Sequence, residues 1–208
     1  MKIIKRSIVC LLTLCGSISS AFAQIAAVEV DKGAQKESVE EVIIVFKMHF
    51  DIGYTDWAES ILQKYATSMM DETLRSVRET ETLPLQDQFV WTLPGWPMKY
   101  MLENTSEAYK PALDAALKKG RFKVHALPFT IETESSDLET LVRSMGFSSR
   151  INRQYGFALP RGAKLTDVPS HSWILPTLLT QAGVKILHIG CNPGSKSPDV
   201  PALFWWEG

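Results

Sequence analysis

The stretch that decides the fold is VIIVFKMHFDIGYTDW, residues 42–57. Its first five residues are β-branched or aromatic, which is typical of a buried strand in a parallel sheet. A helical pattern follows over residues 57–78, and Thr55 or Asp56 is placed to cap that helix. His49 and Asp51 therefore lie where a strand ends and its loop begins. In α/β proteins this edge of the sheet is the one that binds ligands.

His49 and Asp51 are a candidate pair of metal ligands. Side chains alternate in direction along a strand, so two residues that are two positions apart point the same way. An imidazole and a carboxylate directed together at a sheet edge are typical of half a zinc site. Gly53 follows them and lets a ligand or another backbone approach closely.

Apolar runs of strand length alternate with helical patterns from residue 41 onward. The strands predicted are 42–49, 89–92, 122–127, 164–167, 184–189 and 202–206, and the helices predicted are 57–78, 106–119, 136–150 and 172–182. Ser136 with Glu139 forms a capping box, and Gly120 and Gly183 are expected as left-handed helix ends. This alternation predicts parallel strands in a barrel or a doubly wound sheet. A barrel needs about eight such units, and about six strands are predicted here. We therefore interpret the domain as unfinished, an incomplete (β/α)7-type barrel with parallel strands, with a small complete open sheet as the alternative.

The N-terminus predicts export. A basic start, an apolar run and the small-x-small sequence Ala21-Phe22-Ala23 are typical of a secretory signal peptide over residues 1–23. Residues 24–40 are predicted to be a flexible leader, and residues 41–208 to be the folded domain. The mature protein is expected in the periplasm or outside the cell.

Composition excludes two classes of partner. The net charge is −1, and no cluster of Lys and Arg interleaves with aromatic residues, so nucleic acid is not an expected partner. No segment after the signal peptide is long and apolar enough for a membrane span. Removal of the signal peptide leaves Cys191 as the only thiol, which excludes an internal disulfide bond.

A second constellation, Thr166-Asp167-Val168-Pro169-Ser170-His171-Ser172, ends another predicted strand. Asp167 closes the strand, and His171 and Ser172 begin the helix that follows. Helix capping or a turn would also account for Asp167 and His171. Together with His49 and Asp51, Asp167 completes a His/Asp/Asp set that suits a catalytic Zn²⁺, and Ca²⁺ or Mn²⁺ are the other candidates. The remaining histidines, His125 and His188, are interpreted as hydrogen-bonded core residues.

The two motifs resemble those of glycoside hydrolase family 38, the retaining α-mannosidases. His49-Phe50-Asp51-Ile52-Gly53-Tyr54 is similar to the family's His-x-Asp-x-Gly-Trp, and Asp167-Val168-Pro169-Ser170-His171-Ser172 to its Asp-x-x-Gly-His-Ser. The C-terminal FWWEG, residues 204–208, is similar to a segment that the family carries further on. The resemblance covers residues 41–208 and only the first part of the family's catalytic domain.

The resemblance implies a role for each matched residue. His49, Asp51 and Asp167 would bind zinc, and Asp167 would also be the nucleophile. Tyr54 would stack on the sugar, and His171 and Ser172 would support the ligands without binding the metal. The substrate would be a carbohydrate. The fourth ligand and the general acid/base would come from the remaining C-terminal domains of the full-length enzyme, so the 208-residue chain alone would bind metal weakly and would not hydrolyse glycosides.

The chain departs from the family pattern at three positions. Tyr54 replaces Trp, Ser170 replaces Gly, and Gly190-Cys191-Asn192 stands where the family often has Gly-Arg, which leaves the sugar open. Two alternatives remain at this stage. One is a metal-dependent polysaccharide deacetylase, although its adjacent Asp pair and His ligand run are absent. The other is a non-catalytic carbohydrate-binding remnant with walls from Trp91, Trp96 and Trp205, which are otherwise core residues.

Overall fold

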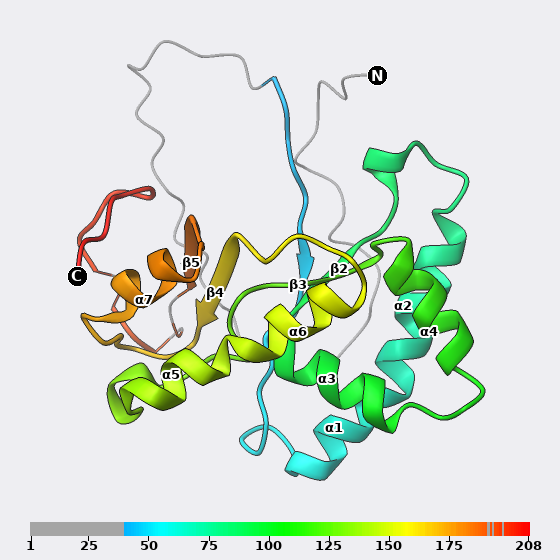
Figure 1. Cartoon of the computed structure of the whole chain (residues 1–208), viewed down its shortest axis with the longest axis horizontal. Coiled ribbons are helices and arrows are strands. Elements are labelled where there is room, and N and C mark those ends of the chain that lie inside the picture. The colour runs from blue at the N-terminus through cyan, green and yellow to red at the C-terminus, as the bar shows by residue number, and fades with distance from the viewer. Residues whose placement is uncertain (1–39, 191, 193, 197) are drawn as a thin grey trace, which may run out of the picture. The chain divides into compact units, whose positions relative to one another are not determined.

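The computed structural model describes residues 40–190, 192, 194–196 and 198–208 (Figure 1). Residues 43–208 form one structural unit, and of the preceding unit only residues 40–42 are described. The predicted signal peptide and nearly all of the predicted leader therefore lie outside the described residues. The helices of the described part are all too short or too polar to cross a lipid bilayer.

Among the described residues, five strands alternate with helices, and two short 3₁₀ turns (Leu85–Asp87 and Thr133–Ser135) interrupt the loops. The strands are β1 (Phe46–Lys47), β2 (Trp91–Leu93), β3 (Phe122–Val124), β4 (Gly162–Thr166) and β5 (Ile186–Gly190). The helices are α1 (Ala58–Ala66), α2 (Ser68–Glu79), α3 (Gly95–Asn104), α4 (Lys110–Lys118), α5 (Leu138–Ser144), α6 (Gly146–Gln154) and α7 (Leu175–Gln181).

All strand pairings are parallel. One sheet has the order β1-β2-β3 and the other pairs β4 with β5. The two sheets meet where the N–H of Ala126, just after β3, donates to the carbonyl of Gly162 at 2.9 Å. The strands thus follow one another in sequence order, and their carboxyl ends share one edge. The predicted α/β class with parallel strands is confirmed, whereas the barrel stays a prediction.

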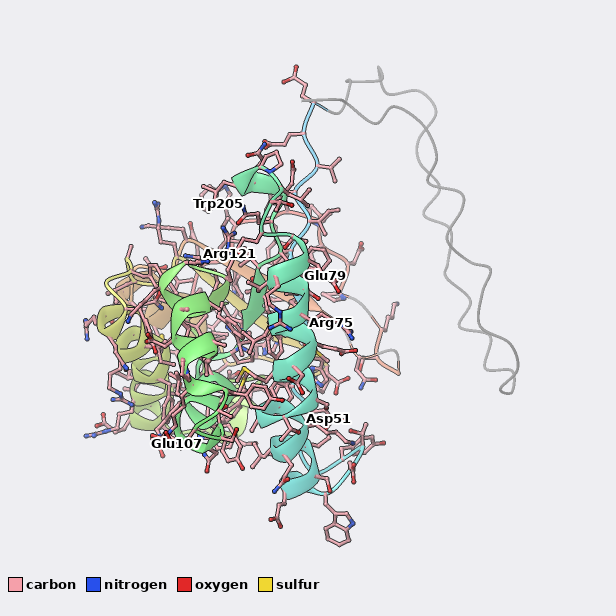
Figure 2. All side chains as sticks on the ribbon, turned by 90° about the vertical axis from the view of Figure 1, so that its right-hand side faces the viewer. Asp51, Arg75, Glu79, Glu107, Arg121 and Trp205 are labelled. Atoms are coloured by element: carbon pink, nitrogen blue, oxygen red, sulfur yellow. The ribbon has the colours of Figure 1, made fainter. Side chains whose placement is uncertain are left out.

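The core lies between the strands and the helices that follow them. Met70, Met98, Met101 and Leu117 project from α2, α3 and α4 onto Trp91, Phe122 and Leu93 of the first sheet. A second cluster joins Leu165 of β4 to Leu175 and Leu179 of α7. The outer face of α2 is charged instead, with Arg75 between Glu72 and Glu79 (Figure 2). Apolar and charged faces at helical spacing explain why these segments fold as surface helices.

Several predicted elements differ from the structure. The helix predicted over residues 57–78 is broken at Thr67, whose hydroxyl donates back to the carbonyl of Gln63 at 2.7 Å. The N-cap of α5 is Asp137, whose side chain accepts from the Thr140 N–H. The predicted capping box of Ser136 with Glu139 was therefore wrong. Residues 202–206 were predicted as a strand but form none, because no described strand lies beside them as a hydrogen-bonding partner.

The apolar run before His49 is also less buried than predicted. Only Phe46 and Lys47 are in β1, and Ile43, Ile44 and Val45 are exposed. The strand pairs with β2 on one side only within the described part of the chain. Its other edge therefore presents unpaired backbone groups beside apolar side chains.

We expect Gly95→Ala to destabilise the fold. Gly95 begins α3, and a Cβ there would lie 2.2 Å from Ser148 Oγ and 2.8 Å from the Ser148 backbone nitrogen. The Ser148 hydroxyl cannot yield easily, since it donates to the His125 carbonyl at 2.6 Å. Overpacking of this kind costs about 1–3 kcal/mol, and denaturant unfolding measures it. Gly162→Ala is the matched control, because nothing lies within 4 Å of its added Cβ. Equal losses in both variants would contradict this reading of the α3–α6 contact.

Candidate functional site

His49 and Asp167 meet at the carboxyl edge of the strands. His49 follows β1 by two residues and Asp167 directly follows β4. The Nε2 atom of His49 lies 3.5 Å from the Oδ2 atom of Asp167, and both side chains are between one third and one half exposed. The structure therefore brings these two motifs, 118 positions apart in the chain, together at one rim through this pair.

The orientation of His49 is set from two sides. Its Nδ1 atom lies 3.0 Å from the hydroxyl oxygen of Thr166, the last residue of β4. This hydrogen bond occupies Nδ1 and directs Nε2 toward Asp167. The next residue, Phe50, is buried against Tyr65 and Trp96 and anchors the segment to the core.

Asp167 has an unusual backbone conformation. Its φ angle is +77°, and it is the only described residue other than glycine with a positive φ. The left-handed region is strained for most side chains, although Asp and Asn tolerate it best. The Asp167 N–H donates to the carbonyl of Gly190 at 3.1 Å, and Asn192 Nδ2 donates to Asp167 Oδ1 at 2.6 Å. Strain held by surrounding hydrogen bonds is typical of functional positions.

The loop after Asp167 rests on the segment after β3. The Ser170 hydroxyl donates to Glu134 Oε2 at 2.6 Å, and the Ser172 N–H donates to the hydroxyl of the buried Thr133 at 2.7 Å. Between them, His171 is half-buried, and its Nδ1 has no hydrogen-bond partner among the described groups. Burial lowers the pKa of His171, and the nearby Glu132 and Glu134 partly oppose this. His171 is therefore mainly neutral near pH 7.

Asp51 and Tyr54 do not join the pair. Within the described ranges no three His, Cys, Asp or Glu side chains are grouped as a metal site would require, so Asp51 is not gathered with His49 and Asp167. Asp51 is half-buried on the segment that leads to α1 (Figure 2). Tyr54 is 94% exposed. His171 and Ser172 were predicted to begin a helix, but α7 begins only at Leu175, so both lie in the loop before it. Their supporting role stays a prediction.

Sequence reasoning missed two residues of the site. Thr166 contacts His49, and Asn192 contacts Asp167. The sequence could have indicated Thr166, because it lies in a predicted strand, directly before the candidate ligand Asp167. Asn192 follows a predicted strand and stands where the family often has Arg, but its contact with Asp167 depends on the register that pairs Thr166 with Gly190. That register is tight: a Cβ on Gly190 would lie 2.6 Å from Thr166 Cγ2.

His49 and Asp167 fit two positions of a zinc site. Ligand atoms at about 2.0–2.2 Å in tetrahedral geometry are about 3.3–3.6 Å apart, which matches the 3.5 Å between Nε2 and Oδ2. The bond from Nδ1 to Thr166 leaves Nε2 as the coordinating nitrogen. The pair thus has the separation and donor types of two ligands, and none of the other described His, Cys, Asp or Glu side chains is grouped with them as a third.

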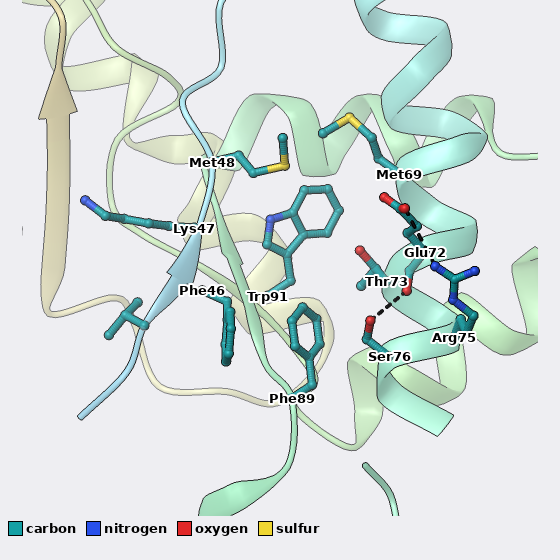
Figure 3. A pocket seen from close by; sticks show the side chains of 11 residues that line it. Phe46, Lys47, Met48, Met69, Glu72, Thr73, Arg75, Ser76, Phe89 and Trp91 are labelled. Carbon is teal, nitrogen blue, oxygen red and sulfur yellow. Dashed lines mark hydrogen bonds and ion pairs between the residues drawn. The ribbon is translucent and has the colours of Figure 1, made fainter. Parts of the chain in front are cut away.

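Two of the hollows in the described part of the chain lie near the motifs. One, of about 770 Å³, is formed by Ser170 and His171 together with Trp173, Trp205 and Trp206. The other, of about 450 Å³, separates β1 from α2 and is lined by Phe46, Phe89, Trp91 and charged residues of α2 (Figure 3). The first adjoins the loop after Asp167 and offers aromatic surface, whereas none of the predicted site residues lines the second.

The tryptophans proposed as walls of a binding groove divide into two kinds. Trp91 is buried, and Trp96 packs against Phe50 and Phe129, so both are core residues. Trp205 is 96% exposed (Figure 2) and contributes to the larger hollow. Aromatic surface for a ligand therefore comes from the C-terminal segment and Trp173.

The fold and site define an α/β protein with a polar His–Asp centre at the carboxyl ends of parallel strands. Residues 40–208 match the model of the family described as "Glycosyl hydrolases family 38 N-terminal domain". The chain belongs to glycosyl hydrolase family 38. The predicted family resemblance is therefore confirmed.

Solved structures with a similar fold come from Enterococcus faecalis. An α-mannosidase from strain V583 aligns with a TM-score of 0.57 at 18% identity, and covers 70% of this chain and 16% of its own. A protein of glycosyl hydrolase family 38 aligns with a TM-score of 0.52 at 17% identity, and covers 69% of this chain and 16% of its own. The chain thus spans about one sixth of the length of either structure. None of the curated proteins matches it.

Proposed function

We propose that this protein is the N-terminal part of an exported, metal-dependent retaining glycoside hydrolase that acts on oligosaccharides in the manner of an α-mannosidase. The observation that carries the proposal is the contact between His49 and Asp167 at the shared strand edge, in a chain of glycosyl hydrolase family 38. Membership in this family favours glycoside hydrolysis over the deacetylase alternative.

Asp167 is the proposed nucleophile. A retaining hydrolase needs a carboxylate that attacks the anomeric carbon and a second carboxyl group about 5–5.5 Å away that acts as acid and then as base. The hydrogen bond from Asn192 to Oδ1 fixes the carboxylate of Asp167 and leaves Oδ2 directed toward His49. The exposed side of the carboxylate is open to a sugar, and the hollow with Trp173 and Trp205 offers aromatic surface beside it.

His49 and Asp167 would hold the zinc ion, with Asp51 as a further ligand once the segment after β1 is drawn toward them. Zinc bound there would polarise substrate oxygens and stabilise the developing charge. This chain's own residues prepare the site: Thr166 orients the imidazole, and Gly190 and Asn192 hold Asp167 in its left-handed conformation. Tyr54, fully solvated here, would pack on the sugar after the same rearrangement.

The remaining C-terminal domains of the full-length enzyme are the proposed partner of this chain. They would supply the fourth ligand and the acid/base carboxyl group. The open edge of β1 and the exposed Ile186 of β5 are surfaces on which further strands can pair and pack. The 208-residue chain is accordingly proposed to be inactive on its own.

Zinc binding tests the site in the isolated chain. We expect weak binding by calorimetry, and we expect His49→Gln or Asp167→Asn to weaken it about 10-fold or more, because each change removes a ligand atom. His188→Gln is the matched control, since His188 is also an exposed histidine of the strand region. Equal weakening in all three variants, or none in the first two, would count against the proposed ligands.

A further inference from the structure

Four basic side chains from four strand segments gather beside the candidate site. We name them the basic cluster: Lys47 of β1, His125 after β3, Lys164 of β4 and His188 of β5. The parallel register pairs Lys164 directly with His188. The Nζ atom of Lys47 lies 3.3 and 3.4 Å from the two ring nitrogens of His188. Lys47 is among the residues that line the hollow between β1 and α2, and its ammonium group points away from α2 (Figure 3).

The two lysines of the cluster have no acidic partner in the described part of the chain. Lys164 Nζ lies 3.0 Å from the Thr166 hydroxyl and 3.4 Å from the Met48 carbonyl. Neither Lys47 nor Lys164 makes an ion pair with a described Asp or Glu. Five other lysines pair with a described carboxylate, namely Lys64, Lys99, Lys110, Lys118 and Lys119, whereas Lys123 and Lys185 also have no such pair.

The buried imidazole of His125 is a second, independent observation that points to a ligand at the cluster. Its side chain is only 8% exposed, and its Nδ1 atom has no hydrogen-bond partner among the described groups. A buried polar atom without a partner is costly, and a bound ion or water molecule is one of the explanations for it. Lys47 and Lys164 are close enough to act electrostatically on this ring.

We propose that the basic cluster binds one oxyanion of the phosphate, sulfate or carboxylate class, held between the ammonium groups of Lys47 and Lys164. An oxyanion accepts charge-assisted hydrogen bonds from both lysines and relieves the repulsion between them. Lys47 and His188 are exposed, so a small anion can reach the cluster from solvent. A ring N–H of His188 or His125 can complete the set of donors.

The anion has two possible sources with the same chemistry. It can bind free from solution, or it can be carried on a saccharide that also occupies the neighbouring His49–Asp167 site. The second source rests on the proposed function, whereas the first does not. The hydroxyl of Thr166 joins the two places, since it contacts both Lys164 Nζ and His49 Nδ1. An acidic group on a sugar at the candidate site would therefore lie near the cluster.

Titration of the 208-residue protein with inorganic phosphate tests the proposal. At pH 7 and constant ionic strength set with chloride, we expect calorimetry to show saturable binding of one phosphate. Lys47→Gln and Lys164→Gln should each weaken it by about 10-fold or more, since each removes a charged donor. Lys185→Gln is the matched control, because Lys185 is an exposed lysine just before β5, and it should change the affinity less than about 2-fold. Lysine side-chain NMR signals of the wild type provide a readout that needs no variant.

The outcomes separate the sources. A hexose 6-phosphate that binds about 10-fold tighter than inorganic phosphate, with hexose alone unable to compete for the cluster, indicates a saccharide-borne anion. Equal affinities indicate a free anion. The proposal is overturned if phosphate acts no differently from chloride, if Lys185→Gln weakens binding as much as Lys164→Gln, or if the wild-type NMR signals of Lys47 and Lys164 do not shift. None of these measurements depends on hydrolase activity, so the proposed function stands or fails separately.

Discussion

Asp167→Asn is expected to lower kcat/KM for an aryl glycoside by about 10⁴-fold or more in the enzyme that carries the rest of the catalytic domain. The amide cannot attack the anomeric carbon and is a weaker zinc ligand than a carboxylate. Asn tolerates the left-handed backbone that position 167 requires, with φ at +77°. The variant should therefore fold normally, and its loss of activity reports on chemistry alone.

The controls for Asp167 follow from the same geometry. Asp167→Ala should lose activity equally and should also lose stability, since alanine is strained at positive φ. A fluorinated sugar that traps the glycosyl-enzyme should add its mass to the wild type at Asp167 and not to the Asn variant. An adduct on another carboxylate, or an Asn variant with more than about one tenth of wild-type activity, would remove Asp167 from the role of nucleophile.

Acid should destabilise this domain through His125. Burial, followed by the charges of Lys164 and Lys47, lowers the pKa of His125 from 6.5 to about 3. The unfolded chain takes up this proton below about pH 6.5, whereas the folded protein resists it. Stability is therefore fully present above pH 6.5 and falls as the pH drops toward 3. At about 1.4 kcal/mol per pH unit, the loss reaches about 4–5 kcal/mol.

Denaturant unfolding between pH 4 and pH 7 measures this effect. His125→Gln removes the titrating group, so its stability should fall less steeply with decreasing pH than that of the wild type. His171→Gln is the comparison, because His171 is only half-buried and Glu132 and Glu134 oppose the lowering of its pKa. Parallel pH curves for the wild type and His125→Gln would show that His125 is not the group responsible.

Local chemistry predicted much of the fold. Gly120 and Gly183 follow their helices with positive φ, as expected for residues that end a helix in the left-handed conformation. The failures lie where tertiary context decides. Thr67 divides one expected helix into two. Its hydroxyl donates back to the preceding turn, and whether such a residue breaks a helix depends on tertiary packing, which the local sequence does not show. Residues 202–206 have strand composition, but no strand of the described part of the chain pairs with them.

Part of the site was also predictable from the sequence. His49 and Asp167 could be paired from sequence because carboxyl ends of parallel strands share an edge. Thr166, Asn192 and Lys164 could not, since their contacts require the register of β4 against β5 and the closeness of Gly190 to Thr166. Asp51 shows the limit of alternation: the backbone after Lys47 leaves the strand, so spacing by two no longer fixes direction.

The open edge of β1 has a consequence for handling the protein. Ile43, Ile44 and Val45 stand beside unpaired main-chain groups, so two molecules that meet there can extend each other's sheet by ordinary strand pairing. Concentrated solutions of the isolated chain will favour such stacking over time. Storage at low concentration is therefore expected to slow this association.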